Sequence, residues 1–234
     1  MNEVAKHPAV ELLQKSPTPL RTSDFVAEGI NRMTLHRLVE KGEIERVGAG
    51  LFRLPKFTSE YADWAAIALR YPDAVICTQS AATFHRTTQD LVGEIHVMRP
   101  HKEGTRSTLA SSFPVSTRVV RVRNEHSVDP FSYGVEEHVI DNIPVKITDL
   151  ERTLVDMFRF STFNRAARSG QGHVSEESLL VCMERTLSRR EFSIDKLTDY
   201  AEKAGIRRAM SPLLKASLHI VSSLPEEHYS TQSL

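Results

Sequence analysis

The chain has 234 residues, of which 40% are hydrophobic, and this is enough for two ordinary domains that each bury a core. Thirty Lys and Arg balance thirty Asp and Glu, so no net charge attracts the protein to nucleic acid or to a membrane surface. It has no apolar run of about twenty residues, and Glu3, Lys6 and His7 stand where a signal peptide has its apolar core, so we expect a cytoplasmic protein without membrane contact.

Residues 22–29 predict the first helix of a helix-turn-helix. Thr22 or Ser23 can cap a short helix whose apolar residues Phe25 and Val26 lie on one side. Gly29 supplies the left-handed residue that lets the chain stop and turn into the next helix.

A second helix is predicted to begin after Asn31, which can cap it, and to end at Gly42. The helical spacing of its apolar residues defines one packed side, formed by Met33, Leu35, Leu38 and Val39. The polar residues of the same segment point elsewhere and are therefore available to a partner.

After Gly42 the helical period gives way to β-forming residues. Residues 44–54, interrupted by Gly48-Ala49-Gly50, predict two short strands joined by a tight turn. A hairpin directly behind such a helix is typical of the wing of a winged helix-turn-helix, which we place at residues 1–57.

This arrangement predicts double-stranded DNA as a partner, because the second helix of a winged helix-turn-helix enters the major groove and the wing follows the phosphate backbone. The predicted base-reading residues are Asn31, Arg32, Thr34 and His36, and the predicted phosphate contacts are Arg37, Arg46, Arg53 and Lys56. Residues 1–58 hold nine Lys or Arg against seven Asp or Glu, a small surplus that favours a specific binder of modest affinity. A protein–protein module of the same shape stays open as an alternative.

Residues 58–222 predict a second domain, and the fold class is α+β with a mixed β-sheet and packed helices. A helix over residues 60–70 ends before Pro72, and a small-residue helix capped near Ser80 follows the first strand. The predicted strands are 74–78, 94–98, 115–122, 135–140 and 143–147, with Asp141-Asn142 as the turn between the last two.

The remainder of this domain is predicted to be helical. A helix begins at Thr148, which stands at capping-box spacing from Glu151. Further helices are predicted near 174–188, 193–204 and 206–221, whereas residues 161–172 form a loop or mobile insert and residues 223–234 a flexible polar tail.

A basic segment lies in the middle of the chain. Arg118, Arg121 and Arg123 occupy both sides of one predicted strand. They either form a solvated face or extend the contact with DNA, or bind RNA.

The residues do not predict catalysis, a metal site or a cofactor. Cys77 and Cys182 lie in apolar runs and are expected to be buried thiols. A nuclease centre requires carboxylates on the strand beside Lys146, but Asp141 falls in a turn. The sequence also lacks a Gly-rich phosphate loop and a dinucleotide fingerprint.

Four motifs in order over about residues 10–160 carry a resemblance to a known family. These are Gly50-Leu51-Phe52-Arg53-Leu54-Pro55, then Gln79-Ser80-Ala81-Ala82 with His85, then Ile95-His96-Val97, and finally Ile143-Pro144-Val145 with Ile147-Thr148, Arg152-Thr153-Leu154 and Asp156. In this combination the chain resembles the AbiEi antitoxins of bacterial type IV toxin–antitoxin systems.

The resemblance implies a protein with two roles. The winged helix would bind inverted repeats in the promoter of its own operon and repress it, and the C-terminal domain would counteract a co-encoded nucleotidyltransferase toxin without forming a stable complex. The alternative is a winged-helix regulator whose C-terminal domain dimerises or senses a ligand.

Four residues of the shared motifs receive no chemical role from the sequence. Arg152 and Asp156 are four apart on a predicted helix, where an ordinary ion pair is the simplest account. Ser80 is expected to cap a helix rather than act as a nucleophile, and His85 is expected to be a hydrogen-bonding residue near a helix end.

Overall fold

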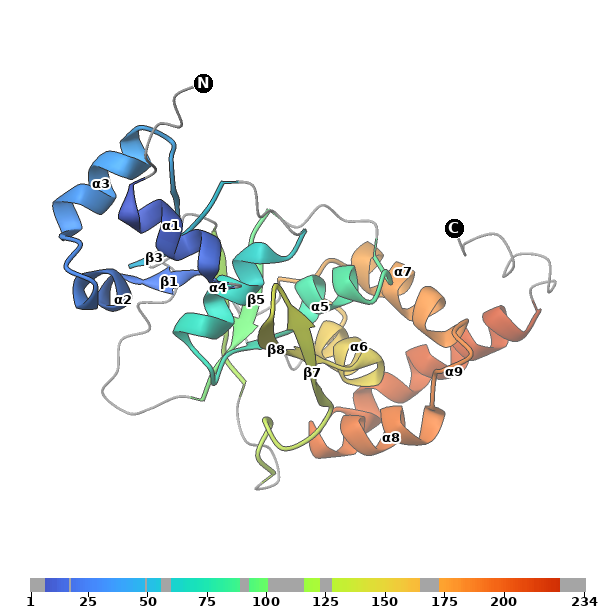
Figure 1. The fold of residues 1–234 in the computed structure, drawn as a ribbon. Coiled ribbons are helices and arrows are strands. Elements are labelled where there is room, and N and C mark those ends of the chain that lie inside the picture. Colours follow the sequence, from blue (N-terminus) through green and yellow to red (C-terminus); the bar gives the residue numbers. More distant parts are fainter. Residues whose placement is uncertain are drawn as a thin grey trace.

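The computed structural model describes residues 7–16, 18–48, 50–55, 60–88, 93–100, 116–122, 128–164 and 173–223. It has the predicted α+β architecture, in which a winged helix-turn-helix precedes a mixed β-sheet with packed helices (Figure 1). Lys56, Arg123, residues 165–172 of the predicted loop and residues 224–234 of the predicted tail lie outside the described residues.

The N-terminal unit, residues 7–55, has a small antiparallel sheet in the order β1-β3-β2. Its elements are α1 (Pro8–Lys15), β1 (Leu20–Arg21), α2 (Thr22–Ala27), α3 (Arg32–Glu40), β2 (Glu45–Gly48) and β3 (Leu51–Arg53). The sequence pattern does not predict α1 or β1. β1 is only two residues long, and it exists because Leu20 and Arg21 pair with Phe52 and Leu51 of the wing.

The ends of α2 and α3 follow from local hydrogen bonds. Asn31 caps α3 as predicted, because its side-chain oxygen accepts the Met33 N–H at 2.6 Å. The predicted cap of α2 by Thr22 or Ser23 is wrong: the Asp24 carboxylate accepts the Arg21 N–H at 2.7 Å instead. The Thr22 hydroxyl donates to the carbonyl of Gly50 and thereby ties α2 to the wing turn.

The core of the N-terminal unit is formed by α1, α2, α3 and the wing. Phe25 and Phe52 meet edge to face with ring centroids 5.8 Å apart, and Leu35 and Leu38 of α3 pack beside them. Met33 does not belong to this packed side as predicted, because 62% of it is exposed. It stands two residues before Leu35, which is about half a helical turn away.

The C-terminal unit, residues 60–223, has a mixed sheet in the order β6-β5-β4-β8-β7. The pairs β4–β8 and β5–β6 are parallel, whereas β4–β5 and β7–β8 are antiparallel. Asp141 and Asn142 both have positive φ and form the predicted hairpin turn. The elements up to this hairpin are α4 (Ala62–Arg70), β4 (Val75–Ile76), α5 (Thr78–Phe84), β5 (Ile95–Met98), β6 (Thr117–Val120), β7 (Val135–Ile140) and β8 (Ile143–Thr148).

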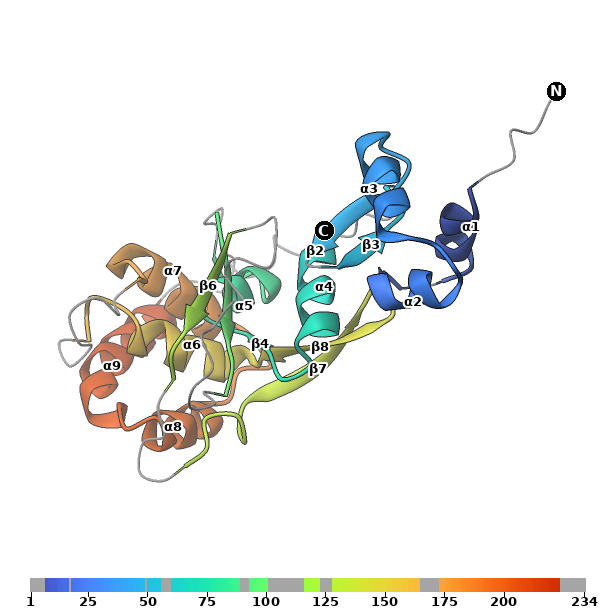
Figure 2. The ribbon, with the colours of Figure 1, turned by 90° about the vertical axis from the view of Figure 1, so that its left-hand side faces the viewer.

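Helices cover both faces of this sheet. Figure 2 shows α4 between the winged helix and the sheet, and the later helices on the other side. Successive residues of a strand point to opposite faces of the sheet. Ile76 and Val97 therefore pack toward α4, whereas Val75 and Met98 pack toward the later helices. The later helices are α6 (Leu150–Arg159), α7 (Glu176–Leu187), α8 (Ile194–Lys203) and α9 (Arg207–Ser223). Within the described residues, none of the helices has the length and apolar character needed to span a membrane.

The two units share a core. Val47 and Leu51 of the wing belong to the same apolar cluster as Trp64 of α4. The Arg21 guanidinium also donates to the carbonyl of Leu69, at the end of α4, at 2.7 Å. The wing is therefore packed directly onto the C-terminal unit.

We predict that Leu51→Ala destabilises the whole chain. Leu51 is fully buried in the shared cluster, so its truncation should lower the free energy of unfolding by about 2–5 kcal/mol. Urea denaturation followed by the fluorescence of Trp64, the one tryptophan of the chain, measures this loss at the junction itself. Val26→Ala is the matched control, because Val26 is half exposed and should change stability by no more than about 0.5 kcal/mol. Equal stability of the two variants would contradict the shared core.

Candidate nucleic-acid interface

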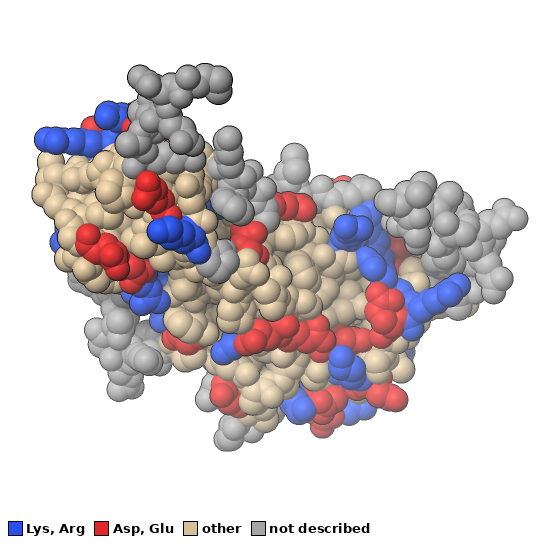
Figure 3. Space-filling model, viewed as in Figure 1, with Lys and Arg blue, Asp and Glu red and all other residues tan. Residues whose placement is uncertain are grey.

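The outer side of α3 is exposed and basic. Arg32 and Arg37 are both exposed, and the side chain of neither forms a hydrogen bond or an ion pair within the described residues. Thr34 is partly buried, and Leu35 and Leu38 hold the opposite side of the helix in the core. Figure 3 shows basic side chains projecting from the end of the molecule that carries α3. The first turn of α3 thus offers positive charge on a fixed helix.

Two other predicted base-reading residues already have local contacts. The side-chain oxygen of Asn31 is used by the helix cap. His36 lies 3.4 Å from the Glu40 carboxylate, but both side chains are largely exposed, so a competing ligand could displace this contact at low cost. Of the predicted base-reading set, Arg32 is therefore the residue with the longest free side chain.

The wing residues differ in their availability. Arg46 is exposed, and its Nε donates to the Gly48 carbonyl at 3.1 Å. Arg53 is only 11% exposed, and its Nε donates to the Glu45 carboxylate at 2.9 Å. Arg53 could contact a phosphate only if this ion pair opened. Burial raises the pKa of the neighbouring Asp63, and Arg53 partly offsets this effect.

The structure does not place the basic residues of β6 beside α3. Figure 2 shows β6 at the far side of the sheet, with α4 between it and the winged helix. Arg118 is partly exposed and forms an ion pair with Glu94. Arg121 is exposed, just beyond the end of the strand. Of the two described arginines of this patch, Arg121 is therefore the one whose side chain forms no ion pair with another described residue.

Two residues of the shared motifs fasten α5 to its neighbours. The Ser80 hydroxyl accepts the His96 N–H at 2.8 Å, which ties α5 to β5. The predicted cap at Ser80 is wrong, because α5 begins earlier, at Thr78. His85 contacts the Thr148 carbonyl through Nε2 at 2.7 Å, and it must donate this bond because a carbonyl only accepts. Burial lowers the pKa of His85, which favours this neutral, hydrogen-bonded ring.

The predicted ion pair between Arg152 and Asp156 is confirmed, with Nε and Oδ2 3.0 Å apart. Both side chains are buried, which distinguishes the pair from an ordinary surface contact. Arg152 also donates to the carbonyls of Pro130 and Tyr133 and lies over the Tyr133 ring. A Cβ on Gly134 would come within 2.5 Å of Arg152, so this glycine permits the close approach. The motif therefore joins the segment before β7 to α6.

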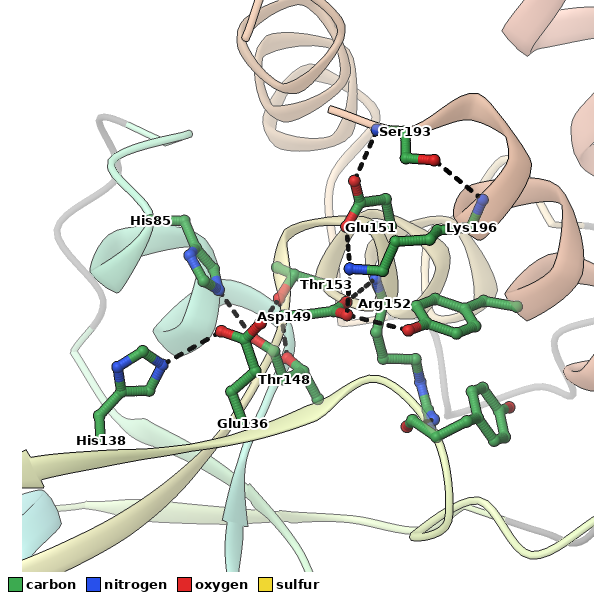
Figure 4. A network of polar contacts seen from close by, with 12 residues as sticks. His85, Glu136, His138, Thr148, Asp149, Glu151, Arg152, Thr153, Ser193 and Lys196 are labelled. Atoms are coloured by element: carbon green, nitrogen blue, oxygen red, sulfur yellow. Dashed lines mark hydrogen bonds and ion pairs between the residues drawn. The ribbon is translucent and has the colours of Figure 1, made fainter. Parts of the chain in front are cut away.

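A second polar network joins α6 to α8, and Figure 4 shows Lys196 reaching toward Asp149 and Glu151. Lys196 lies 3.1 Å from Asp149 and 3.3 Å from Glu151. The predicted capping box of Thr148 and Glu151 is wrong: Asp149 caps α6 by accepting the Arg152 N–H, and Glu151 accepts the Ser193 N–H. Burial lowers the pKa of Lys196, but Asp149 and then Glu151 outweigh it and raise the pKa overall.

The same network borders a cleft of about 450 Å³. Arg86, Arg189 and Glu136 line this cleft. Asp149 and Lys196, which contact each other, line it as well. Among the described residues, no group of three or more His, Cys, Asp or Glu is arranged to hold a metal ion. Of the carboxylates that line the cleft, Asp149 and Glu151 bind Lys196 and so join α6 to α8, whereas Glu136 pairs with His138.

His96 is a buried residue whose contacts the sequence does not reveal. Its Nδ1 lies 2.7 Å from the Thr78 hydroxyl, and its ring packs against His173 at 4.9 Å. Burial, followed by the charges of His173 and Arg118, lowers its pKa to about 4, although Glu94 opposes the shift. Burial likewise raises the pKa of the Cys77 and Cys182 thiols, and both cysteines are buried as predicted.

We predict that stability falls as the pH is lowered from about 6.5 to about 4. The folded protein holds His96 neutral in this window, whereas the unfolded chain takes up the proton, so acid favours unfolding. The full shift corresponds to about 3 kcal/mol. His96→Asn, which can keep a contact with Thr78, should reduce this loss in urea denaturation at several pH values. His36→Asn changes an exposed ring on α3 and should reproduce the wild-type curve; an equal effect of both variants would refute the assignment to His96.

The comparisons with known proteins agree with this geometry. Residues 8–55, which run from α1 to the end of the wing, match the family described as "Transcriptional regulator, AbiEi antitoxin". The whole fold is similar to the crystal structure of the RV2827C protein from Mycobacterium tuberculosis, with a TM-score of 0.57, 14% identity and coverage of 89% of this chain and 75% of that chain. At this identity the likeness concerns the fold alone. A search among curated proteins gave no match. The predicted resemblance is thus confirmed at the N-terminus, where residues 8–55 are similar to the AbiEi antitoxin transcriptional regulators.

Proposed function

We propose that the protein is a type IV antitoxin that binds inverted repeats in the promoter of its own operon and represses it. The observation that carries the DNA-binding part is the exposed first turn of α3, where Arg32 has no partner within the described residues. The similarity of residues 8–55 to antitoxin transcriptional regulators supports the same conclusion.

In the proposed complex, α3 lies in the major groove. Its first residues, Arg32 and Thr34, face base edges, with Asn31 and His36 beside them. Arg37 and Arg46 contact phosphates, together with Lys56 and, if its ion pair opens, Arg53. Because the unit has few free cations, a single copy binds weakly, and two copies on an inverted repeat gain the necessary affinity.

We assign the antitoxin role to the C-terminal unit. In this proposal residues 1–57 bind DNA, residues 58–222 counteract a co-encoded nucleotidyltransferase toxin without a stable complex, and residues 223–234 are a flexible tail. The match to antitoxin regulators supports the general role. The proposal involves no catalysis by this chain.

A second candidate function is a regulator whose C-terminal unit senses a small charged ligand. The cleft of about 450 Å³ between α5, α6 and α8 favours it, since a ligand there would contact Arg86 and Arg189. A regulator of this kind would not protect cells from a toxin.

We predict that Arg32→Ala weakens specific DNA binding by about 1–3 kcal/mol, because a bidentate contact to a base would be lost. A mobility-shift assay with the full chain and the DNA upstream of its own gene measures the effect. Arg190→Ala is the matched control, since it removes an exposed arginine from the connection between α7 and α8. Equal affinity of the Arg32 variant and the wild type would contradict the proposed placement of α3.

The central basic patch can be tested by salt dependence. If Arg121 touches a phosphate, Arg121→Ala should flatten the slope of log affinity against log salt by about 0.9, irrespective of the DNA sequence. Arg118→Ala should leave the slope unchanged, because Arg118 is paired with Glu94. An unchanged slope for both variants would indicate that this patch is only a solvated face.

The two proposed roles can be separated in the full chain. A variant with both Arg32→Ala and Arg37→Ala, expressed from an unrelated promoter, should lose repression of a reporter but still rescue cells that express the neighbouring nucleotidyltransferase. This is expected because both changes lie on α3, remote from the C-terminal unit. Failure of the wild-type chain to rescue these cells would exclude the antitoxin role and favour the ligand-sensing regulator.

A further inference from the structure

The exposed side of α3 contains an apolar residue among basic ones. Met33 is 62% exposed and occupies the second position of the helix, directly after Arg32 and four residues before Arg37. It packs into none of the apolar clusters of the described residues. The nearest acidic residue on the same helix, Glu40, lies in the last turn beside His36. The first two turns therefore present a large apolar side chain between two arginines.

This pattern defines the chemistry of a partner. Arg32 and Arg37 favour anionic groups or hydrogen-bond acceptors, and Met33 between them favours a small apolar group. The major groove of DNA provides all of these, because phosphates line its edges, base edges carry acceptors and the 5-methyl group of thymine is the apolar group that its base pairs present. An acidic protein surface with an apolar spot would suit the same side chains, but the similarity of residues 8–55 to transcriptional regulators favours DNA as the partner.

We infer that Met33 reads the 5-methyl group of a thymine in each half-site of the operator. The inference rests on the proposed DNA binding and adds to it the identity of one base. The thioether side chain is long and flexible, so it can follow the methyl group while Arg32 and Arg37 hold the helix in the groove. The N-terminal cap by Asn31 fixes the first turn of α3 and thereby the direction from which Met33 approaches.

The experiment uses the full chain and the duplex that it selects from random DNA. Each thymine of the selected site is replaced in turn by deoxyuridine, which removes only the methyl group. At one position in each half-site, the wild type should lose about fourfold in affinity per half-site, as expected for about 0.8 kcal/mol from one buried methyl group. Met33→Ala should bind the thymine site more weakly by a similar factor and show no further loss with deoxyuridine. Met33→Leu should retain much of the thymine preference.

A matched control and two outcomes make the test decisive. Ile194→Ala removes an exposed apolar side chain from α8, outside the winged helix, and should keep the full thymine preference. If Met33→Ala loses as much affinity with deoxyuridine as the wild type does at each position, the inference is overturned while the proposed DNA binding stands. If the chain selects no DNA sequence at all, the proposed function fails together with the inference.

Discussion

The C-terminal unit is organised by the burial of α6. Every residue of this helix from Leu150 to Phe158 is buried, although Glu151, Arg152 and Asp156 are charged. A charge without a partner in such an environment would cost several kcal/mol, so each of the three needs a partner. Asp156 pairs with Arg152, Arg152 also binds the carbonyls before β7, and Glu151 binds the start of α8. The charges of one helix thereby specify which segments surround it.

A second constraint links this unit to the winged helix, which carries the proposed DNA-binding surface. The side chains of Val47 and Leu51, both in the wing, pack in the apolar cluster around Trp64, and Arg21 donates a hydrogen bond to the end of α4. The orientation of α3 is consequently set by packing against the C-terminal unit rather than by a loose connection. In a dimer on DNA, the distance between two recognition helices would then depend on the whole chain, and half-site spacing would become a property of both units.

The charge distribution is consistent with a binder that gains its strength from specific contacts. Several cations of the N-terminal unit already have local partners, as Arg53 does with Glu45. Arg32 and Arg37 remain free within the described part of the chain, and both belong to the helix that would enter the groove. Under the proposed function, such a surface would attract DNA weakly at a distance and distinguish sequences once in contact.

The sequence by itself determined those features that depend on neighbours within a few residues. The cap at Asn31, the turns at Gly29 and Asp141-Asn142 and the period of the later helices are local, and for this reason the winged helix and the α+β class could be predicted. The sequence also predicted the pairing of Arg152 with Asp156, because one helical turn separates them. Tertiary structure decided what lies around these elements. The strand β1 forms only against the wing, Ser80 bonds to a strand rather than capping a helix, and Glu151 finds its partner on α8. Met33 belongs to the local features instead: it lies about half a helical turn from Leu35, so helical spacing alone already turns it away from the packed side, and the prediction that it packs there was wrong for that reason.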